Sequence, residues 1–256
     1  MKRIFLLTAF ISLYSLLSFA QQNEDANAIA SQANNPLASI KSISVHNVYT
    51  SSVYGMDGSM NTTWLRYAQP FGRILVRASM PINTVNVINT NKSGLGDFNV
   101  FGTYILTPPT ATKQLGIGPI LTIPTATSSL LGGGKWQIGA ALAAYIATNP
   151  VLQCGLLATW QHSFAGSSHR NTVNLATIQP FFMWQLGKGL YLRSTAINVL
   201  DFENGNYLIP IGLGMGKIVK VNKVIFNIFA EPQFTVWHRG EGLPEIQYFI
   251  GINTQF

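Results

Sequence analysis

The chain has 256 residues, of which 47% are hydrophobic and only 10% are charged, and its 16 Lys and Arg against 9 Asp and Glu give a net charge of +7. The charged fraction lies far below the ~25% of an average soluble protein, and the basic residues are dispersed, so nucleic-acid binding is not expected. With one cysteine, Cys154, an internal disulfide is excluded. No composition break divides the chain, which indicates a single domain.

Residues 1–20 have the pattern of a cleaved secretory signal peptide. Lys2 and Arg3 precede an apolar run at 4–17, and the following Ser-Phe-Ala supplies small residues at the −3 and −1 positions of a cleavage site. The alternative is an N-terminal membrane anchor, for which the run is short. No later stretch of about twenty apolar residues is present, so a membrane helix is not expected. An apolar, exported chain of this kind favours a β-barrel in the outer membrane of a Gram-negative bacterium.

Residues 21–40 form a separate N-terminal segment before the expected barrel at 41–256. They lack the alternation of a strand, and Ile29 and three alanines recur at helical spacing. Such a segment could lie inside the barrel as a plug, because twelve strands enclose a lumen wider than side chains alone would fill. It could equally be a disordered periplasmic tail, which its polar composition favours slightly. Both alternatives stay open at this point.

From residue 41 onward, polar and apolar residues alternate with the period of two that is typical of strands. In 224–236, for example, Phe226 and Ile228 share one face, whereas Asn227 and Glu231 lie on the other. Twelve strands are expected, at 41–54, 60–69, 73–82, 95–107, 114–124, 134–148, 151–164, 172–186, 190–200, 207–219, 223–237 and 246–256. A soluble secreted β-sandwich would also alternate, with its apolar face inward. The low charge favours lipid outside and a polar lumen.

Short and long connections alternate between these strands, as periplasmic turns and outer loops do in a bacterial barrel. The short ones fall at 70–72, 108–113, 149–150, 187–189 and 220–222, and the longer ones at 55–59, 83–94, 125–133, 165–171, 201–206 and 238–245. The sequence therefore predicts an all-β fold, an antiparallel transmembrane β-barrel of about twelve strands. We expect a monomer surrounded by outer-membrane lipid.

The last expected strand, 246–256, ends on Phe256 and carries Tyr248, Ile250 and Ile252 on the same face. This strand is expected to pair with the first, because pairing removes the open edges of the sheet. A C-terminal Phe preceded by apolar residues at every second position also resembles the signal that outer-membrane proteins present to the barrel-assembly machinery. That machinery is the expected partner of Phe256.

Several stretches along the mature chain share the pattern of one family. They are NPLA (35–38), GLGD (94–97), LGIGPILTIPTAT (115–127), LGGGKWQIGAAL (131–142), IQPFFMW (178–184), LIPIGLGMGKI (208–218) and EPQFTV (231–236). These stretches resemble the MetA-pathway phenol-degradation proteins, a family of outer-membrane transporter barrels. The resemblance implies a membrane barrel that moves small molecules, with aromatic ones as one expected class. It carries over no functional residue.

No catalytic residue, cofactor or metal is expected. The glycine-rich stretch 131–135 lacks the complete phosphate-loop pattern, and the four histidines have no zinc-like spacing. His162 and Ser163 are neighbours on a strand, so their side chains point to opposite faces and cannot form a catalytic pair. The sequence therefore does not predict an enzyme.

The candidate functional residues are those on the lumen side of the strands. They comprise the charged or polar Arg66, Arg73, Arg77, Asp97, Arg193, Glu231 and Gln233, and the glycines Gly116, Gly118, Gly212, Gly214 and Gly216. The charges could be mutually paired and structural. Alternatively, they form a weakly basic constriction that favours anionic or aromatic solutes. The glycines either leave room for a pore or a plug, or relieve strain in a curving sheet.

The expected function is passive uptake of small molecules, aromatic or hydrophobic solutes among them, through an outer-membrane channel. Two alternatives remain. A structural or adhesive barrel would act through its outer segments 83–94 and 125–133. An outer-membrane lipid-modifying enzyme would need a convergent Ser, His and acid near one rim.

Overall fold

A computed structural model describes residues 29, 32–87, 90–108, 111–149 and 151–256. The expected signal peptide at 1–20 lies outside the described residues, and so does nearly all of 21–31. Residues 32–34 form one helical turn, and the elements after it are strands. Within the described ranges, no helix is long and apolar enough to cross a membrane.

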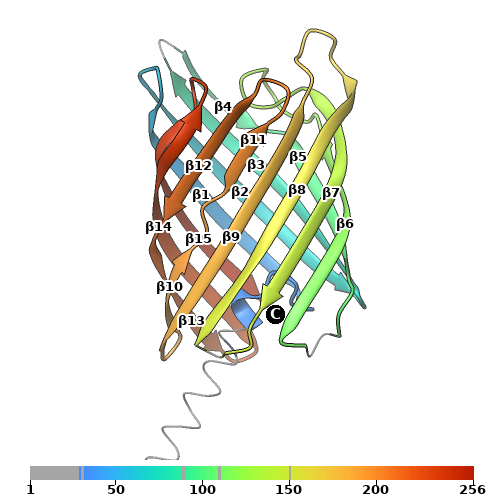
Figure 1. Ribbon diagram of the computed structural model, residues 1–256, viewed down its shortest axis with the longest axis vertical. Coiled ribbons are helices and arrows are strands. Elements are labelled where there is room, and N and C mark those ends of the chain that lie inside the picture. Colours follow the sequence, from blue (N-terminus) through green and yellow to red (C-terminus); the bar gives the residue numbers. More distant parts are fainter. Residues whose placement is uncertain (1–28, 30–31, 88–89, 109–110, 150) are drawn as a thin grey trace, which may run out of the picture.

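The strands form one antiparallel sheet that curls into a tube (Figure 1). They are β1 (Ser42–Val53), β2 (Gly58–Phe71), β3 (Ile74–Val87), β4 (Thr90–Leu95), β5 (Phe98–Ile105), β6 (Lys113–Ile123), β7 (Lys135–Ile146), β8 (Leu152–Gly166), β9 (Asn174–Gly187), β10 (Leu190–Ser194), β11 (Asn198–Asp201), β12 (Asn206–Gly212), β13 (Gly214–Val221), β14 (Val224–Arg239) and β15 (Pro244–Gln255). Three barrel strands are interrupted, because β4 and β5 both pair with β3, β10 and β11 with β9, and β12 and β13 with β14. The fold is thus a twelve-stranded barrel, as predicted.

The first and last strands close the sheet. β15 pairs with β1 from Ser42↔Gln255 onward, and on its other side it pairs with β14. This closure confirms the predicted pairing of the last strand with the first. The N–H of Phe256 donates to the carbonyl of Lys41 at 3.0 Å. Recognition of Phe256 by the assembly machinery stays a prediction.

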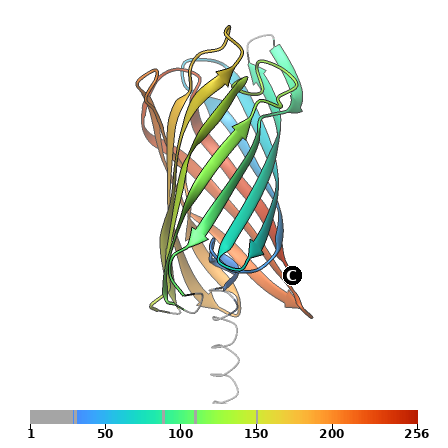
Figure 2. The same cartoon turned by 90° about the vertical axis from the view of Figure 1, so that its right-hand side faces the viewer.

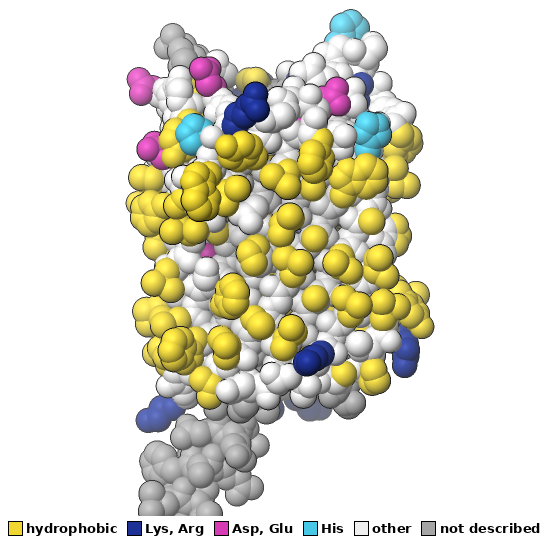
Figure 3. Space-filling view, viewed as in Figure 1, with side chains coloured by type: hydrophobic (Ala, Val, Ile, Leu, Met, Phe, Trp, Pro, Cys, Tyr) yellow, Lys and Arg dark blue, Asp and Glu magenta, His cyan; other side chains and the backbone are white. Residues whose placement is uncertain are grey.

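The apolar face of the strands points outward. On β14, Ile228 and Phe234 are half exposed, whereas Asn227 and Glu231 are buried on the inside. Figure 3 shows apolar side chains over the sides of the barrel, with charged side chains gathered towards its ends. The closed barrel and this outward apolar face rule out the β-sandwich.

Exposed aromatic side chains lie towards both ends of the barrel. They are Trp136, Trp160, Phe164, Phe202 and Trp237 near the longer connections, and Tyr67, Phe71, Tyr104, Phe182, Trp184 and Phe256 near the short turns. Aromatic girdles of this kind flank the apolar band of outer-membrane barrels, where amphipathic rings sit at the lipid–water boundary.

The connections follow the predicted alternation, with two exceptions in their form. The two-residue turns at 188–189 and 222–223 use positive φ angles at Lys188 (51°) and Asn222 (56°). The segment 83–94, expected as a loop, is mostly a hairpin, since β3 runs to Val87 and β4 begins at Thr90. The connection 124–134 turns inward, with Leu131 only 4% exposed. Figure 2 shows the long connections at one end of the tube and the C-terminus towards the other.

One part of the wall lacks ladder pairing between neighbouring strands. Ladder pairs connect 190–193 with 214–217, and 199–201 with 206–208. Between these two patches, residues 194–198 and 209–213 have no ladder partners in one another among the described strands. We call this region the seam; the break between β10 and β11 is visible in Figure 1.

Candidate functional site: the barrel lumen

Residues of the described ranges line two adjoining cavities in the lumen. The larger, about 760 Å³, lies towards the long connections and reaches Asp97 and Leu131. The smaller, about 190 Å³, lies towards the short turns and reaches Gln255. Seven residues line both cavities and mark the boundary between them, which we call the constriction: Arg66, Arg77, Phe101, Leu157, Gln179, Thr195 and Phe249.

Residues 32–40 lie inside the barrel on the side of the short turns, and six of them line the smaller cavity. Leu37 is 2% exposed and packs against Ile105 and Ala143 of the barrel wall. Ala33 is likewise buried in a cluster with wall residues. Three hydrogen bonds connect the segment to the wall: Asn35 Nδ2 to Gln114 Oε1 at 3.0 Å, Asn227 Nδ2 to Asn34 Oδ1 at 2.9 Å, and Gln255 Nε2 to the Ala33 carbonyl at 3.1 Å. The segment therefore occupies the lumen on this side of the constriction.

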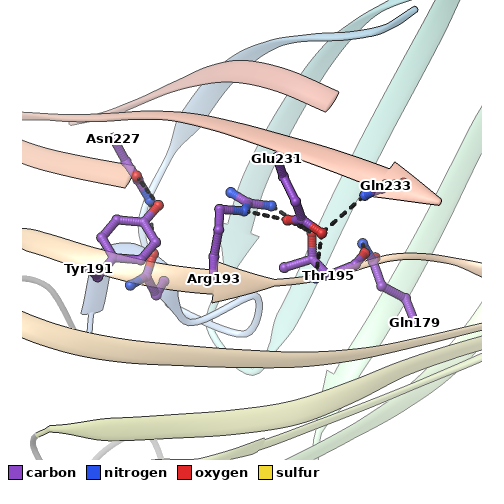
Figure 4. Close-up of polar contacts among 8 residues, drawn as sticks. Gln179, Tyr191, Arg193, Thr195, Asn227, Glu231 and Gln233 are labelled. Carbon is purple, nitrogen blue, oxygen red and sulfur yellow. Dashed lines mark hydrogen bonds and ion pairs between the residues drawn. The ribbon is translucent and has the colours of Figure 1, made fainter. Parts of the chain in front are cut away.

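Arg193 and Glu231 form a buried ion pair beside the seam (Figure 4). Arg193 Nε donates to Glu231 Oε2 at 2.8 Å. Glu231 also accepts hydrogen bonds from the Thr195 N–H at 2.8 Å, the Thr195 hydroxyl at 2.7 Å and Gln233 Nε2 at 3.1 Å. The Arg193 guanidinium lies 3.5 Å from the centre of the Phe229 ring. The carboxylate is thus fully engaged by its neighbours, and it satisfies a backbone N–H where the ladder is broken.

The predicted lumen glycines give space that neighbouring groups fill. A Cβ at Gly212 or Gly214 would collide with Glu231, and one at Gly216 would collide with the Tyr191 ring. On β6, a Cβ at Gly116 would meet Thr103 and Leu37, and one at Gly118 would run into the Gly102 backbone. Four of the five glycines therefore make room for the Arg193–Glu231 pair, for Tyr191 or for Leu37, and Gly118 allows close approach of the Gly102 backbone.

Asp97 lines the larger cavity, but its carboxylate binds an outer connection. Oδ1 accepts the Ala126 N–H at 3.1 Å, and Oδ2 accepts the Gly133 N–H at 2.6 Å. Arg170 also fixes this connection, since its guanidinium donates to the carbonyls of Gly132 and Gly133. Asp97 therefore anchors the inward-turned connection 124–134.

Arg66 and Arg77 point into the lumen from adjacent strands. An Arg66 terminal nitrogen lies 2.7 Å from His46 Nδ1, and His46 Nε2 lies 2.7 Å from Asn253 Oδ1. Because the asparagine oxygen only accepts, Nε2 carries the ring proton and Nδ1 accepts from Arg66. The Arg77 guanidinium lies 4.2 Å from the centre of the Phe101 ring.

The predicted site residues therefore separate into three groups. Arg193, Glu231 and Gln233 form one network, and Asp97 belongs to another. Arg66 and Arg77 lie together at the constriction. Arg73 shares their parity along the sequence, but the structure places it in the turn between β2 and β3, exposed to solvent. It does not reach the lumen.

Sequence reasoning missed the aromatic part of the constriction. Trp64, Phe101 and Phe249 line the larger cavity, and His46 lines the smaller. Phe101 and Phe249 lie on the inner parity of strands whose lumen face was expected to be polar. Their common signal is an aromatic residue on the polar parity. Within the described residues, no group of three or more His, Cys, Asp or Glu could hold a metal ion.

A scan against protein-family models gives no match, and no curated protein matches the sequence. The resemblance to the MetA-pathway family is therefore not confirmed. The structure is similar to the COG4313 outer membrane channel from Pseudomonas putida F1, with a TM-score of 0.65 and 14% identity over 87% of this chain and 97% of that one. It is similar to the NanC porin, with a TM-score of 0.58 and 12% identity over 84% and 100%. At these identities, the likeness establishes the fold.

The closed twelve-stranded sheet, its outward apolar face and these neighbours define the class of protein. The chain is an outer-membrane β-barrel of the Gram-negative type. Among solved barrels, it shares the architecture of proteins described as channels and porins.

Proposed function

We propose that the protein is a channel for passive uptake of small molecules across the outer membrane. The observation that carries the proposal is the pair of adjoining cavities, about 760 and 190 Å³, inside a closed barrel. The larger volume lies in the range of small-molecule sites, about 300–1,000 Å³. Phe101, Phe249 and Trp64 on its wall suit aromatic or hydrophobic solutes, and the stretches that resemble the MetA-pathway family support the same class.

In this proposal, the segment 21–40 restricts the periplasmic side of the channel. Its described part buries Leu37 and Ala33 in the lumen and is connected to the wall by side-chain hydrogen bonds. These contacts lie outside the ladder that holds the wall together, so the segment takes part in no strand pair, and we expect the barrel to fold without it.

We expect the purified mature protein to admit a small neutral sugar into liposomes, measured as swelling. Deletion of 21–40 is expected to raise the swelling rate, because it removes the segment that lines the smaller cavity and takes up part of the lumen beside it. The exposed turn variant Arg73→Gln serves as a control and is expected to swell like the parent. Heat-dependent gel migration checks that each form is a folded barrel.

The same swelling measurement can contradict the channel proposal. If neither the intact nor the deleted form admits solute while both are folded, the protein is not a channel, and a structural or adhesive barrel is left. A lipid-modifying enzyme receives no support from His162 and Ser163, which the sequence already excluded as a catalytic pair. His162 is exposed on the outer face, and Ser163 Oγ accepts the Val173 N–H at 2.9 Å.

A further inference from the structure

We propose that Arg66 and Arg77 form a binding site for the carboxylate of a small aromatic acid at the constriction. The inference deepens the proposed function by naming a substrate class, and it rests on that function for its role in uptake. Binding itself does not require flux, so the two can be tested separately.

Arg66 and Arg77 lie on the same face of two paired strands, β2 and β3. On β2 and β3, Ala68 pairs with Arg77 and Arg66 pairs with Ser79. The two arginines are therefore diagonal neighbours on the same face, at a distance that long side chains can bridge. Both line the two cavities, so a molecule that passes from one cavity to the other meets them both.

Among the residues that the structure describes, neither Arg66 nor Arg77 has an anionic partner. The Nε atoms of Arg66 and Arg77 are buried and make no hydrogen bond. Across the described residues, the ion pair found is Arg193 with Glu231. The neighbour of Arg66, His46, acts as an acceptor and brings no negative charge.

Three described acids line the lumen or lie beside it, and each accepts hydrogen bonds from other groups. Glu231 is held by Arg193 and Thr195, and Asp97 binds backbone N–H groups of an outer connection. Asp201, also on the larger cavity, accepts hydrogen bonds from the N–H groups of Glu203 and Asn204. Among the described residues, the constriction thus carries two positive charges and no acid.

A carboxylate is the anion that suits two neighbouring guanidinium groups best. A buried charge without a partner is costly, and an anion that supplies the partner is correspondingly favoured. The planar guanidinium matches the two oxygens of a carboxylate, which can accept two parallel N–H bonds. A monocarboxylate adds one negative charge against two positive ones, so the constriction stays weakly positive. The bound acid is therefore not locked in place by full charge neutralisation and can dissociate, as passage through a channel requires.

Aromatic side chains lie beside both arginines and favour a ligand that carries an aromatic ring. Phe101 lies beneath Arg77, and the Trp64 ring lies 4.9 Å from the Arg66 guanidinium. Both rings line the larger cavity together with Phe249 and Leu157. An acid with its carboxylate on the arginines therefore places a single ring against aromatic and aliphatic walls, where offset or edge contacts are favourable.

The test measures binding of benzoate to the full mature protein in detergent, by equilibrium dialysis. We expect saturable binding of benzoate, with binding of the neutral benzamide and of acetate at least about tenfold weaker, since each lacks one half of the recognition. Arg77→Gln is expected to weaken benzoate binding by about tenfold or more, the effect of one lost charge-assisted hydrogen-bonding partner. Arg77→Lys is expected to give an intermediate loss, because it keeps the charge without the fork.

Arg73→Gln is the matched control, because it removes the same charge from an exposed turn, and it is expected to bind benzoate like the parent. Heat-dependent gel migration shows whether each variant is folded; if Arg77→Gln is not, Arg66→Gln replaces it in the comparison. Equal binding of benzoate and benzamide, or full benzoate binding by the folded arginine variants, would overturn the inference. A protein that binds benzoate but passes no solute would refute the channel and leave the site standing.

Discussion

Glu231 and Arg193 are buried at 1% and 6% exposure, and each is the charge partner of the other. Such a pair is expensive to break, because removal of one partner leaves the other charge buried and uncompensated. Arg66 and Arg77 differ from this pair in that the described residues offer them no acid. Two kinds of charge thus share one lumen, a closed pair beside the seam and an open pair at the constriction.

Replacement of Glu231 by Gln is expected to destabilise the barrel by about 3–5 kcal/mol, because Arg193 stays charged and the amide cannot take the place of both oxygens. The double variant Arg193→Met with Glu231→Leu is expected to lose less, since no isolated charge remains. Urea titration followed by heat-dependent gel migration measures both. A single variant as stable as the parent would show that the pair contributes nothing.

At this scale, the sequence predicted which side a residue faces but not which residues meet. The parity rule places Glu231 and Arg193 inside, as observed, because side chains alternate across a strand. Their contact joins residues 38 positions apart on non-consecutive strands, and nothing local encodes it. Parity also misled for Arg73, since it holds along a strand and ends where the turn begins.

The connection 124–134 is held by side chains from two other elements. Asp97 lies between β4 and β5, and Arg170 lies between β8 and β9. The Asp97 carboxylate accepts from both ends of the connection, which turns it inward and buries Leu131. Leu131 and Gly132 of this connection line the larger cavity.

Asp97→Asn is expected to loosen this connection without unfolding the wall. The neutral amide retains one acceptor, so the charged hydrogen bond to the Gly133 N–H weakens by an amount worth about tenfold or more. Hydrogen exchange at the Gly133 amide is therefore expected to speed up by that factor. In the control Asp201→Asn, which alters a different turn, the Gly133 amide is expected to exchange as in the parent. Unchanged exchange in Asp97→Asn would mean that the carboxylate does not hold the connection.

Strand positions were the best-predicted elements, because period-two alternation is strong where one face meets lipid and the other meets water. All twelve expected strands are present. Their interruptions were not predicted, since a break at 195–197 or at Leu213 depends on what the neighbouring strand offers. The sequence also left open whether the segment 21–40 enters the lumen. That residues 32–40 do so depends on the space that the assembled wall encloses, which local sequence does not show.

For the whole molecule, the stability of the barrel in lipid depends on the outward apolar face. Leu142, in the middle of β7, points outward, whereas Thr177 on β9 lines the larger cavity. A charge on the lipid face must be taken out of water, and one in the lumen is not.

Leu142→Arg is therefore expected to cost about 2–4 kcal/mol, the range for a basic residue near the bilayer midplane. Thr177→Arg adds the same side chain inside the barrel and is expected to cost much less. Unfolding of both variants in lipid vesicles by urea, compared with the parent, gives the difference. Equal costs for the two would mean that Leu142 does not face hydrocarbon.

The seam gives the wall an uneven mechanical character. Around most of the circumference, main-chain hydrogen bonds join neighbouring strands, and among substitutions only proline removes the N–H that such a bond needs. Between residues 194–198 and 209–213, the described strands lack these ladder pairs, and the Glu231 side chain accepts a hydrogen bond from the Thr195 main chain instead. At the seam, the resistance of the two strands to lateral separation therefore depends on a side chain, so a single codon change can alter it.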